Sequence, residues 1–323
     1  MRSKGHDVFV VSRNKEMEHA LLNLYGIPFI TRGKGKSGFI SKLLYLIYAD
    51  AKLLWISKKH RIDLFLNFLH PYPSQVAKML GKVSLVFGDT EHAKLHHKLT
   101  LPYATKVYTP SCYKTDLGAK QTRFRSYMEL AYLHPRYFNP DPSVLKLLGV
   151  CETEKYIIVR FVSWQAVHDF GFSGLTLKNK IEAVNKLSKY AKVFISSEGP
   201  LPAHFEKYRL NIPFDKMHDV IYYSALSFGE SGTMSSEAAV LGTPSVYINS
   251  NDLGYLNEQE LKYGLVYNFS NSEQDQKAAI DKALEILSVE NSKNDFYKKR
   301  EQLLKDCIDT TEFMVEEVLK YNK

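Results

Sequence analysis

Residues 229–244 read Gly-Glu-Ser-Gly-Thr-Met-Ser-Ser-Glu-Ala-Ala-Val-Leu-Gly-Thr-Pro, and this stretch decides the fold. The apolar run Leu226–Phe228 comes directly before it, and the helical pattern Ser235–Leu241 lies within it. A buried strand that leads through a turn of small residues into a helix is typical of the carboxyl edge of a parallel sheet. The first N–H groups of such a helix have no partner inside the helix, and the helix dipole makes that end positive. The stretch therefore predicts a site for a phosphate-bearing ligand.

Two kinds of contact are expected in this turn. Backbone N–H groups would hold a diphosphate, and Gly232 would let a phosphate approach because it has no Cβ. Glu237 would accept hydrogen bonds from the vicinal hydroxyls of a ribose; the alternative is that Glu237 only complements the positive helix end. The residues expected to form the diphosphate site are Ser231, Gly232, Thr233, Met234 and Ser235.

Short apolar runs alternate with helical patterns along the rest of the chain, which predicts parallel sheets covered by helices on both faces. The strands predicted in the first half are Val8–Val11, Pro28–Ile30, Leu64–Phe68, Ser84–Phe87 and Lys106–Thr109. The helices predicted there are Lys15–Leu24, Phe39–Lys59, Ser74–Leu80 and Glu91–Leu99. The strands predicted in the second half are Tyr156–Val162, Lys192–Ser196, Leu226–Phe228 and Ser245–Ile248, with helices Leu175–Tyr190, Pro213–Ala225 and Ser235–Leu241.

A prolyl segment, Asn139-Pro140-Asp141-Pro142, separates the two halves. It can continue neither a helix nor a strand ladder, so we predict two domains, residues 1–140 and 141–323. A total of 323 residues suits two domains. An amphipathic stretch of about Ser292–Tyr321 closes the chain, and we expect it to pack back on the first domain.

The chain opens at Met1-Arg2-Ser3-Lys4-Gly5-His6-Asp7, which resembles the last turn of a helix. In a doubly wound sheet the first strand is central, so its loss would leave strand edges unpaired. We therefore expect a first strand and helix, about 20–30 residues, to be encoded upstream. The alternative is that the protein has lost that unit and rearranged its sheet.

Composition limits the classes of function. The net charge of +8 and pI of about 9.0 favour anionic partners. The chain contains no long basic run and no zinc-finger or RNA-recognition signature, so nucleic acid is not an expected partner. Three separated cysteines, no signal-peptide pattern and no apolar run of about 20 residues favour the cytoplasm.

Four motifs together carry a resemblance to known proteins. They are the turn at 229–237, Phe87-Gly88-Asp89-Thr90-Glu91-His92-Ala93, Glu129-Leu130-Ala131-Tyr132-Leu133-His134-Pro135, and the segment Arg160–Asp169. The turn resembles the nucleotide-binding segment of GT-B glycosyltransferases and of UDP-N-acetylglucosamine 2-epimerases. The whole chain is similar to an archaeal and bacterial family of unknown function related to both. The resemblance implies a GT-B-like α/β architecture of two Rossmann-type domains with parallel sheets facing a central cleft, the first domain lacking its first strand and helix. It also implies a nucleotide-sugar ligand.

The segment after the first strand of the second half is expected to open toward the same ligand. Its nucleotide-sugar-binding candidates are Arg160, Ser163 and Trp164, and its catalytic candidates are His168 and Asp169. The epimerases carry a histidine and an arginine in the comparable loop, whereas Asp169 stands here after His168, so Arg160 would have to supply positive charge. The alternative is a structural His–Asp pair.

Asp89, Glu91 and His92 follow a strand of the first half and could together deprotonate an acceptor hydroxyl or a sugar carbon. The epimerases carry a glutamate at the position comparable to Glu91. The alternative is that Asp89 caps a helix starting near Thr90 and Glu91 suits its dipole. His92 and His96 stand four apart, but no third metal ligand is spaced to join them, so we predict no metal site.

Several polar and aromatic residues remain. His70 and Glu129 are expected at the cleft rim. Gly33-Lys34-Gly35-Lys36-Ser37-Gly38 fails as a dinucleotide fingerprint and is interpreted as a basic loop for an acceptor phosphate or as a plain linker. The aromatic positions Tyr45, Tyr48 and Trp55 form either a core stripe or a membrane-facing stripe.

The favoured function is transfer of a sugar from a nucleotide donor, UDP-linked by the resemblance, to a sugar or lipid-linked acceptor in surface polysaccharide or glycoconjugate synthesis. The alternatives are a UDP-N-acetylglucosamine 2-epimerase-like isomerase and a non-catalytic nucleotide-sugar-binding protein. No cofactor is expected, because a helix N-terminus and basic residues can stabilise a leaving diphosphate. Peripheral contact with the inner face of the membrane is a further expectation.

Overall fold

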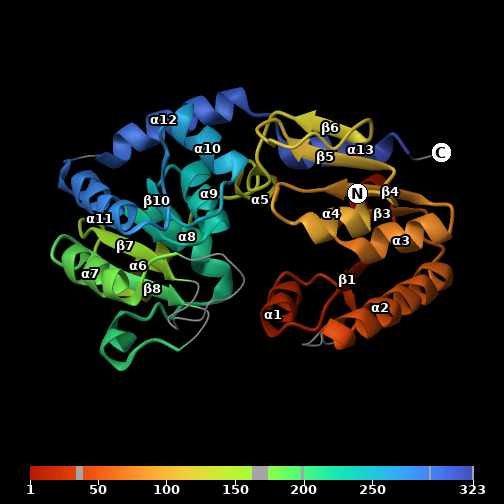
Figure 1. Cartoon of the computed structure of the whole chain (residues 1–323), viewed down its shortest axis with the longest axis horizontal. Coiled ribbons are helices and arrows are strands. Elements are labelled where there is room, and N and C mark those ends of the chain that lie inside the picture. Colours follow the sequence, from red (N-terminus) through yellow and green to blue (C-terminus); the bar gives the residue numbers. More distant parts are fainter. Residues whose placement is uncertain (34–38, 162–173, 198–199, 291, 322–323) are drawn as a thin grey trace. The chain divides into compact units, whose positions relative to one another are not determined.

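The computed structural model describes residues 1–33, 39–161, 174–197, 200–290 and 292–321 (Figure 1). The chain divides into two compact units. Unit 1 comprises Met1–Phe124 and Thr311–Lys323, and unit 2 comprises Arg125–Thr310. Each unit has its own parallel sheets and its own buried core.

Unit 1 contains two parallel sheets. The first pairs β1 (Val10–Ser12) with β2 (Phe29–Thr31), and the second has the order β3-β4-β5-β6. The strands of the second sheet are β3 (Leu64–Phe68), β4 (Val83–Phe87), β5 (Lys106–Pro110) and β6 (Gln121–Phe124). The helices are α1 (Glu16–Leu24), α2 (Phe39–Lys59), α3 (Pro71–Met79), α4 (Lys94–Thr100) and α13 (Thr310–Leu319), and a 3-10 turn, η1, spans Arg2–Lys4.

Helices cover both faces of the four-stranded sheet of unit 1. Helix α3 packs between α2 and α4 and contacts β3 and β4. On the other face, Phe313 of α13 stacks on Phe124 with a centroid distance of 5.2 Å and meets Phe87 and Tyr108 edge-on. The Tyr108 hydroxyl donates to Glu317 Oε2 at 2.9 Å. Burial next to that carboxylate raises the pKa of Tyr108.

Unit 2 contains one five-stranded parallel sheet in the order β11-β10-β9-β7-β8. Its strands are β7 (Tyr156–Phe161), β8 (Lys192–Ser197), β9 (Leu226–Gly229), β10 (Ser245–Ile248) and β11 (Val266–Phe269). Its helices are α5 (Leu130–Leu133), α6 (Ser143–Leu148), α7 (Leu177–Leu187), α8 (Met217–Tyr223), α9 (Gly232–Leu241), α10 (Gly254–Leu261), α11 (Glu273–Ser288) and α12 (Ser292–Asp306), with 3-10 turns η2 (Ala203–Tyr208) and η3 (Phe214–Lys216).

Burial explains why these strands lie at the centre of unit 2. Ile157, Ile158 and Val159 of β7 are fully buried, as continuous apolar strands of a two-sided sheet should be. Helices α7 and α11 pack together on one face, and α8, α9 and α12 pack together on the other. Ala238 and Ala239 are also fully buried, so α9 lies close against its sheet.

The chain order makes β7 the turning point of this sheet. After β7 the chain proceeds to β8 on one side, and after β8 it returns to β9 on the other side. The connections that leave the carboxyl ends of β7 and β9 therefore diverge. Such a divergence opens a crevice at the carboxyl edge of a parallel sheet, where ligands of α/β proteins bind.

The predicted fold of two α/β units with parallel sheets is confirmed, but the predicted boundary at residue 140 is not the observed one. Segment 125–142 packs on unit 2, where Asp141 N donates to Asp219 Oδ1 at 2.8 Å and the Ser126 hydroxyl donates to the carbonyl of Ile308.

The predicted C-terminal stretch is two helices. Helix α12 belongs to unit 2, and nearly all of α13 belongs to unit 1.

Candidate functional site

The carboxyl ends of β7 and β9 lie in contact at Gly229. Gly229 has a φ of 152°, and a Cβ added there would lie 2.0 Å from the carbonyl oxygen of Arg160. The Glu230 N–H donates to the same carbonyl at 2.9 Å. Only glycine lets the two backbones approach so closely, and this contact fixes the turn at the crevice.

Helix α9 begins at this turn with its N-terminus toward the carboxyl edge of the sheet. Ser231 is its N-cap, and the serine hydroxyl accepts from the N–H of Met234 at 3.4 Å. The N–H of Ser235 bonds the carbonyl of Ser231, which begins the helical ladder. Within the described part of the chain, no hydrogen bond involves the N–H groups of Gly232 and Thr233. These two donors, with the helix dipole, can bind an oxyanion.

The first turn of α9 packs against neighbouring side chains of unit 2. A Cβ at Gly232 would lie 2.5 Å from Leu253 Cδ1 and 2.9 Å from the Tyr255 hydroxyl, so the missing Cβ leaves room for these two side chains at the start of α10. The side chains of Met234 and Ser235 are buried. Any contact of Met234 and Ser235 with a ligand would therefore involve the backbone.

Glu237 lies one turn further along α9 and is held by two side chains. Its Oε1 atom accepts from the Tyr132 hydroxyl at 3.0 Å and lies 3.0 Å from His218 Nε2. The Tyr132 and His218 rings pack with centroids 5.5 Å apart, and Phe138 meets His218 edge-on. Both hydrogen bonds end on Oε1, and the Glu237 side chain is 13% exposed. Oε2 is therefore the oxygen available to accept from a ligand hydroxyl.

Glu230 does not face a ligand but forms an internal ion pair. Its Oε1 atom lies 3.0 Å from Lys180 Nζ and accepts from the N–H of Leu175 at 2.7 Å. The Glu230 and Lys180 side chains are 5% and 7% exposed. This buried pair joins the N-terminal part of α7 to the end of β9, and it holds these two elements together beside the turn at Gly229.

Arg160 lies at the carboxyl edge beside this turn. Its Nη1 atom donates to the Ser196 hydroxyl at 2.9 Å, near the end of β8. The guanidinium thus lies near the carboxyl end of β8, the edge strand next to β7. Four other candidates, Ser163, Trp164, His168 and Asp169, lie outside the described residues.

Asp89, Glu91 and His92 follow β4 in unit 1, in the segment between that strand and α4. Helix α4 begins at Lys94, so Asp89 does not cap a helix at Thr90. Instead, Asp89 Oδ1 accepts from the Thr90 hydroxyl at 2.9 Å, and Glu91 Oε1 accepts from the N–H of Lys114 at 3.3 Å. Burial is the main cause of the raised pKa of Asp89, to which the Glu91 carboxylate adds. Glu91 Oε2 is buried without a hydrogen-bond partner among the described residues.

The histidines that follow β3 and β4 in unit 1 lie apart from one another or contact other rings. His92 precedes α4 while His96 lies within it, so the predicted helical face shared by the two does not exist. His97 Nε2 lies 3.1 Å from the Tyr113 hydroxyl, and the His70 and His96 rings are 6.4 Å apart. Within the described ranges, no three His, Cys, Asp or Glu side chains could together hold a metal ion.

The two residues expected at a cleft rim differ in their exposure. His70 follows β3 in unit 1 and is exposed. Desolvation, then the charges of Arg32 and His96, lower the pKa of His70. Glu129 is 3% exposed and buried in unit 2, so the expectation of a rim position was wrong for this residue. It immediately precedes α5, whose packing buries it.

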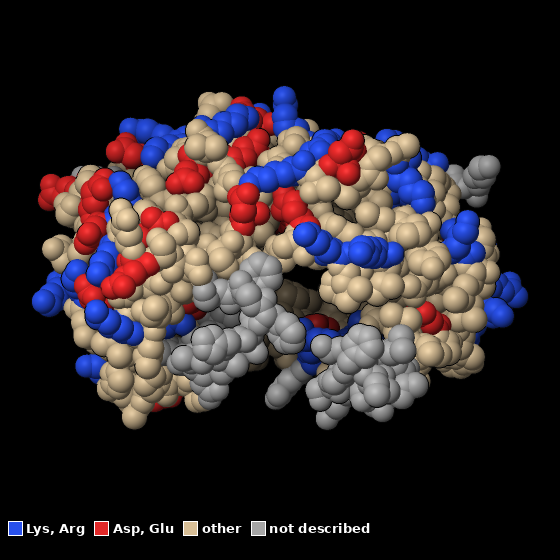
Figure 2. All heavy atoms as spheres, viewed as in Figure 1, with Lys and Arg blue, Asp and Glu red and all other residues tan. Residues whose placement is uncertain are grey.

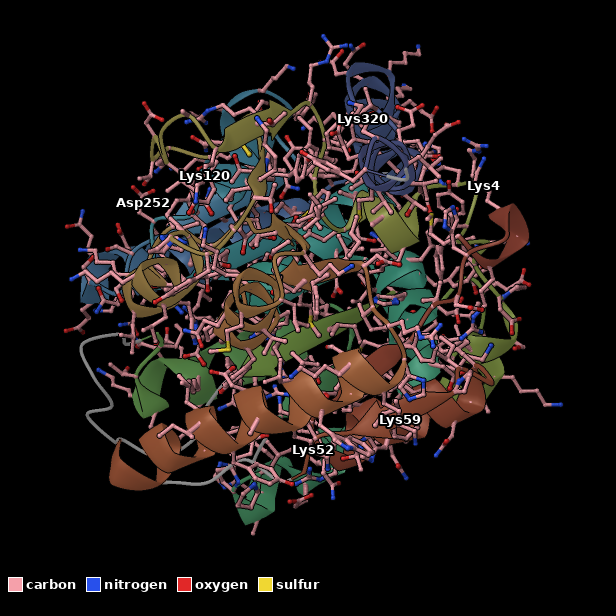
Figure 3. The ribbon with its side chains drawn as sticks, turned by 90° about the vertical axis from the view of Figure 1, so that its right-hand side faces the viewer. Lys4, Lys52, Lys59, Lys120, Asp252 and Lys320 are labelled. Carbon is pink, nitrogen blue, oxygen red and sulfur yellow. The ribbon has the colours of Figure 1, made fainter. Side chains whose placement is uncertain are left out.

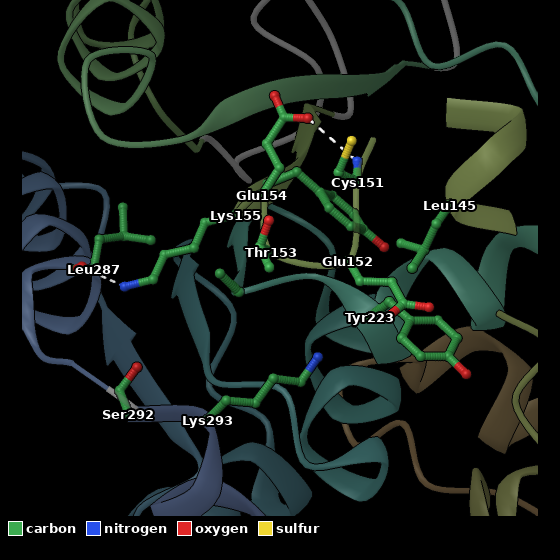
Figure 4. A pocket seen from close by; sticks show the side chains of 12 residues that line it. Leu145, Cys151, Glu152, Thr153, Glu154, Lys155, Tyr223, Leu287, Ser292 and Lys293 are labelled. Carbon is green, nitrogen blue, oxygen red and sulfur yellow. Dashed lines mark hydrogen bonds between the residues drawn. The ribbon is translucent and has the colours of Figure 1, made fainter. Parts of the chain in front are cut away.

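A cavity of about 250 Å³ lies at the opposite edge of the unit 2 sheet (Figure 4). Its lining includes Tyr156 and Ala225, at the amino ends of β7 and β9. Lys293 Nζ donates there to the carbonyls of Tyr222 and Ser224, at the end of α8, and desolvation lowers the pKa of Lys293 to about 7. The cavity thus lies at the amino ends of the strands and not at the carboxyl edge of the sheet.

Charged side chains of both signs are mixed on the visible face of unit 2 (Figure 2). On the face shown in Figure 2, Lys and Arg side chains are interspersed with Asp and Glu over the helices of unit 2. The net charge of +8 therefore forms no continuous basic track over unit 2 on that face.

Sequence reasoning missed three groups of the unit 2 site: Tyr132, His218 and the Glu230–Lys180 pair. Tyr132 lies within a motif quoted above, and His218 lies within a predicted helix. No periodicity in the sequence indicates that either residue faces Glu237, because the pairings span 105 and 19 positions.

Comparison with solved structures confirms the architecture. The UDP-GlcNAc 2-epimerase of Neisseria meningitidis bound to UDP-GlcNAc is 13% identical with a TM-score of 0.68, covering 98% of this chain and 94% of its own. The UDP-GlcNAc 2-epimerase of Methanocaldococcus jannaschii is 11% identical with a TM-score of 0.63, over 98% and 92%. Spinosyn forosaminyltransferase is 12% identical with a TM-score of 0.64, over 100% and 93%. At these identities the likeness shows a shared fold of the GT-B type.

Comparison with curated proteins finds an uncharacterised protein of Methanocaldococcus jannaschii, 27% identical over 168 residues. That match covers 49% of this chain and spans about half the length of the relative. A family model for proteins of unknown function, DUF354, matches residues 1–323. The chain therefore belongs to the DUF354 family.

Proposed function

We propose that the carboxyl edge of the unit 2 sheet binds a nucleotide-sugar and that the protein transfers the sugar to an acceptor. The observation that carries the proposal is that one helix, α9, presents two groups suited to a nucleotide: backbone N–H groups for an anion and a carboxylate for hydroxyl groups. The N–H groups of Gly232 and Thr233 are suited to a diphosphate, and Glu237, one turn away, is suited to ribose hydroxyls. Arg160 would add positive charge at the same edge.

The choice of a UDP-linked donor rests on likeness of fold. Two of the similar structures are named as UDP-GlcNAc 2-epimerases, one of them bound to UDP-GlcNAc. Conserving the edge geometry of such a fold would place the same nucleotide over α9. The acceptor would be a sugar or a lipid-linked sugar, in surface polysaccharide or glycoconjugate synthesis in the cytoplasm.

Acid–base chemistry would come from unit 1. Burial raises the pKa of Asp89, and Glu91 Oε2 is buried without a hydrogen-bond partner among the described residues, so these two carboxyl groups are the candidates for the acid or base. His92 follows them directly. One of the three would take the proton from the acceptor hydroxyl as that oxygen attacks the sugar carbon and the nucleoside diphosphate leaves.

An isomerase is the second candidate. The specific observation in its favour is the likeness to UDP-GlcNAc 2-epimerases over nearly the whole chain. In that reaction the same carboxyl groups would remove a proton from a sugar carbon instead of an acceptor hydroxyl. A nucleotide-sugar-binding protein without turnover is the third.

Incubation of the pure protein with a panel of UDP-sugars, with and without acceptors, distinguishes the three. A transferase gives UDP only when an acceptor is present, whereas an isomerase converts the sugar without one. Binding without turnover in any assay supports the third candidate. No binding of any UDP-sugar contradicts the proposal.

Glu237→Ala tests the site itself. Loss of hydrogen bonds from a charged group to ribose hydroxyls should cost about 1.5–3 kcal/mol, a 10–150-fold rise in the Kd for UDP. Glu301→Ala is the matched control, because Glu301 lies on α12 and its side chain is 60% exposed. Calorimetric titration with UDP gives both values, and equal affinity of wild type and Glu237→Ala would remove Glu237 from the site.

A further inference from the structure

Helix α2 leaves an apolar face open to solvent. Ile47, Tyr48 and Trp55 are 60%, 50% and 60% exposed, and Ala51 between them is also exposed. With about 100° per residue, these positions fall on one side of the helix. The opposite side is buried in unit 1 and includes Tyr45, Ala49, Leu53, Ile56 and Ser57. The aromatic stripe expected from the sequence is therefore divided, with Tyr45 in the core and Tyr48 and Trp55 outside.

Lysines border this face, and no exposed carboxylate of α2 accompanies them. Lys52 Nζ lies 5.9 Å from the Tyr48 ring and Lys59 Nζ lies 5.1 Å from the Trp55 ring, while Lys58 is exposed beside them. Figure 3 shows α2 along the side of the molecule that faces the viewer, with Lys52 and Lys59 labelled on it. The one acidic residue of α2, Asp50, turns its Oδ1 atom into the protein.

We propose that the α2 face, defined as Ile47, Tyr48, Ala51 and Trp55 with Lys52, Lys58 and Lys59, docks on an anionic lipid bilayer. Trp and Tyr have amphipathic rings that favour the headgroup region, and lysines can bury their methylene stems while the ammonium groups meet lipid phosphates. The helix would lie in the plane of the interface. In the part of the chain that the structure describes, no helix is both long and apolar enough to cross a bilayer.

Charge decides between a lipid surface and a second copy of this chain. A symmetric dimer through the α2 face would bring the lysines of one copy against those of the other, and the face offers no carboxylate to balance them. An anionic bilayer supplies the opposite charge across the whole face, at about 1 kcal/mol per lysine, or about fivefold in affinity. The proposal is independent of the donor site of unit 2.

Co-sedimentation with vesicles tests the proposal on the full chain. The protein should bind vesicles of phosphatidylcholine mixed with phosphatidylglycerol, and it should bind pure phosphatidylcholine weakly. Lys52→Gln with Lys59→Gln should weaken binding to the anionic vesicles about thirtyfold. Trp55→Ser should weaken it about tenfold.

Matched surface variants serve as controls. Leu261→Ser removes an apolar side chain that is 86% exposed on α10, and Lys298→Gln removes a lysine that is 81% exposed on α12. Both should bind like wild type. Circular dichroism and UDP binding of each variant show that the fold of both units is retained.

Three outcomes would overturn the proposal. They are equal binding to both kinds of vesicle, equal loss in the control variants, and light scattering that shows a dimer which Trp55→Ser converts to a monomer. The last would assign the α2 face to a second copy. Selective loss in the α2 variants alone supports the lipid surface.

Discussion

At the scale of single residues, two neighbouring side chains fix the Glu237 carboxylate, the proposed ribose-binding group. Tyr132 and His218 both hold Oε1, so the rotamer of Glu237 is set before any ligand arrives. A ligand then loses less free energy to ordering this side chain. Gly229 acts in the same way on the backbone, because its missing Cβ brings β7 and β9 together at the turn.

A double-mutant cycle tests the positioning role of His218. His218→Ala alone should raise the Kd for UDP about 5–30-fold, since it removes a hydrogen bond of about 1–2 kcal/mol to a charged group. In a Glu237→Ala background the same change should have little further effect. An undiminished effect in that background, measured by calorimetry, would show that His218 contacts the ligand itself.

At the scale of elements, helix α2 contains one carboxyl group, that of Asp50, whose charged form is destabilised by burial. Burial raises the pKa of Asp50 from 3.8 to about 6, and Oδ1 has no hydrogen-bond partner among the described side chains. In the unfolded chain this carboxyl titrates near its ordinary value. As the pH rises from about 4 to about 6, the folded state keeps a proton that the unfolded state loses, so the free energy of unfolding falls. Above that range the penalty is constant.

Asp50→Asn should therefore stabilise unit 1 at neutral and alkaline pH. With an allowance for partial exposure, the gain is about 1–2 kcal/mol near pH 8 and close to zero near pH 3. Urea unfolding across this pH range gives the profile. Asp63→Asn is the control, because the Asp63 side chain is 85% exposed and pairs only with Lys82 at the surface. A gain that does not depend on pH would contradict the ionisation argument.

At the scale of the whole chain, the last helix completes the first unit. Helix α13 follows all of unit 2 in the sequence, yet Phe313 and Glu317 lie against Phe87, Tyr108 and Phe124. Unit 1 thus cannot complete its core until the final residues are available. The contact between Tyr108 and Glu317 spans 209 positions, so the core of unit 1 depends on residues far apart in the sequence.

Phe313→Ala should destabilise unit 1 by about 2–4 kcal/mol, because it removes a partly buried ring from an aromatic cluster. Glu316→Ala, on the exposed side of α13, should change stability by less than about 0.5 kcal/mol. Scanning calorimetry should show a lower transition for unit 1 while UDP binding to unit 2 is retained. Equal melting of the two variants would show that α13 contributes no packing.

The sequence by itself determined the alternation of strands and helices, the parallel sheets and the position of the strand–turn–helix unit at 226–241. Each depends on local patterns: apolar runs of strand length, helical spacing and the small residues of 229–235. Strands β6 and β11 and helices α5, α10 and α11 were not predicted, although Ile280, Ala283 and Leu287 of α11 follow helical spacing and are buried.

Only the tertiary structure decided which side chains meet and which remain exposed. Segment 125–142 belongs to unit 2 because Ser126 and Asp141 form hydrogen bonds there. The prolines at 140 and 142 do not indicate these hydrogen bonds. Glu129 is buried, Gly232 lies next to the side chains of Leu253 and Tyr255, and Trp55 is exposed while Tyr45 is buried. Burial and pairing depend on neighbours distant in sequence, whereas strand and helix patterns depend on neighbours a few residues away.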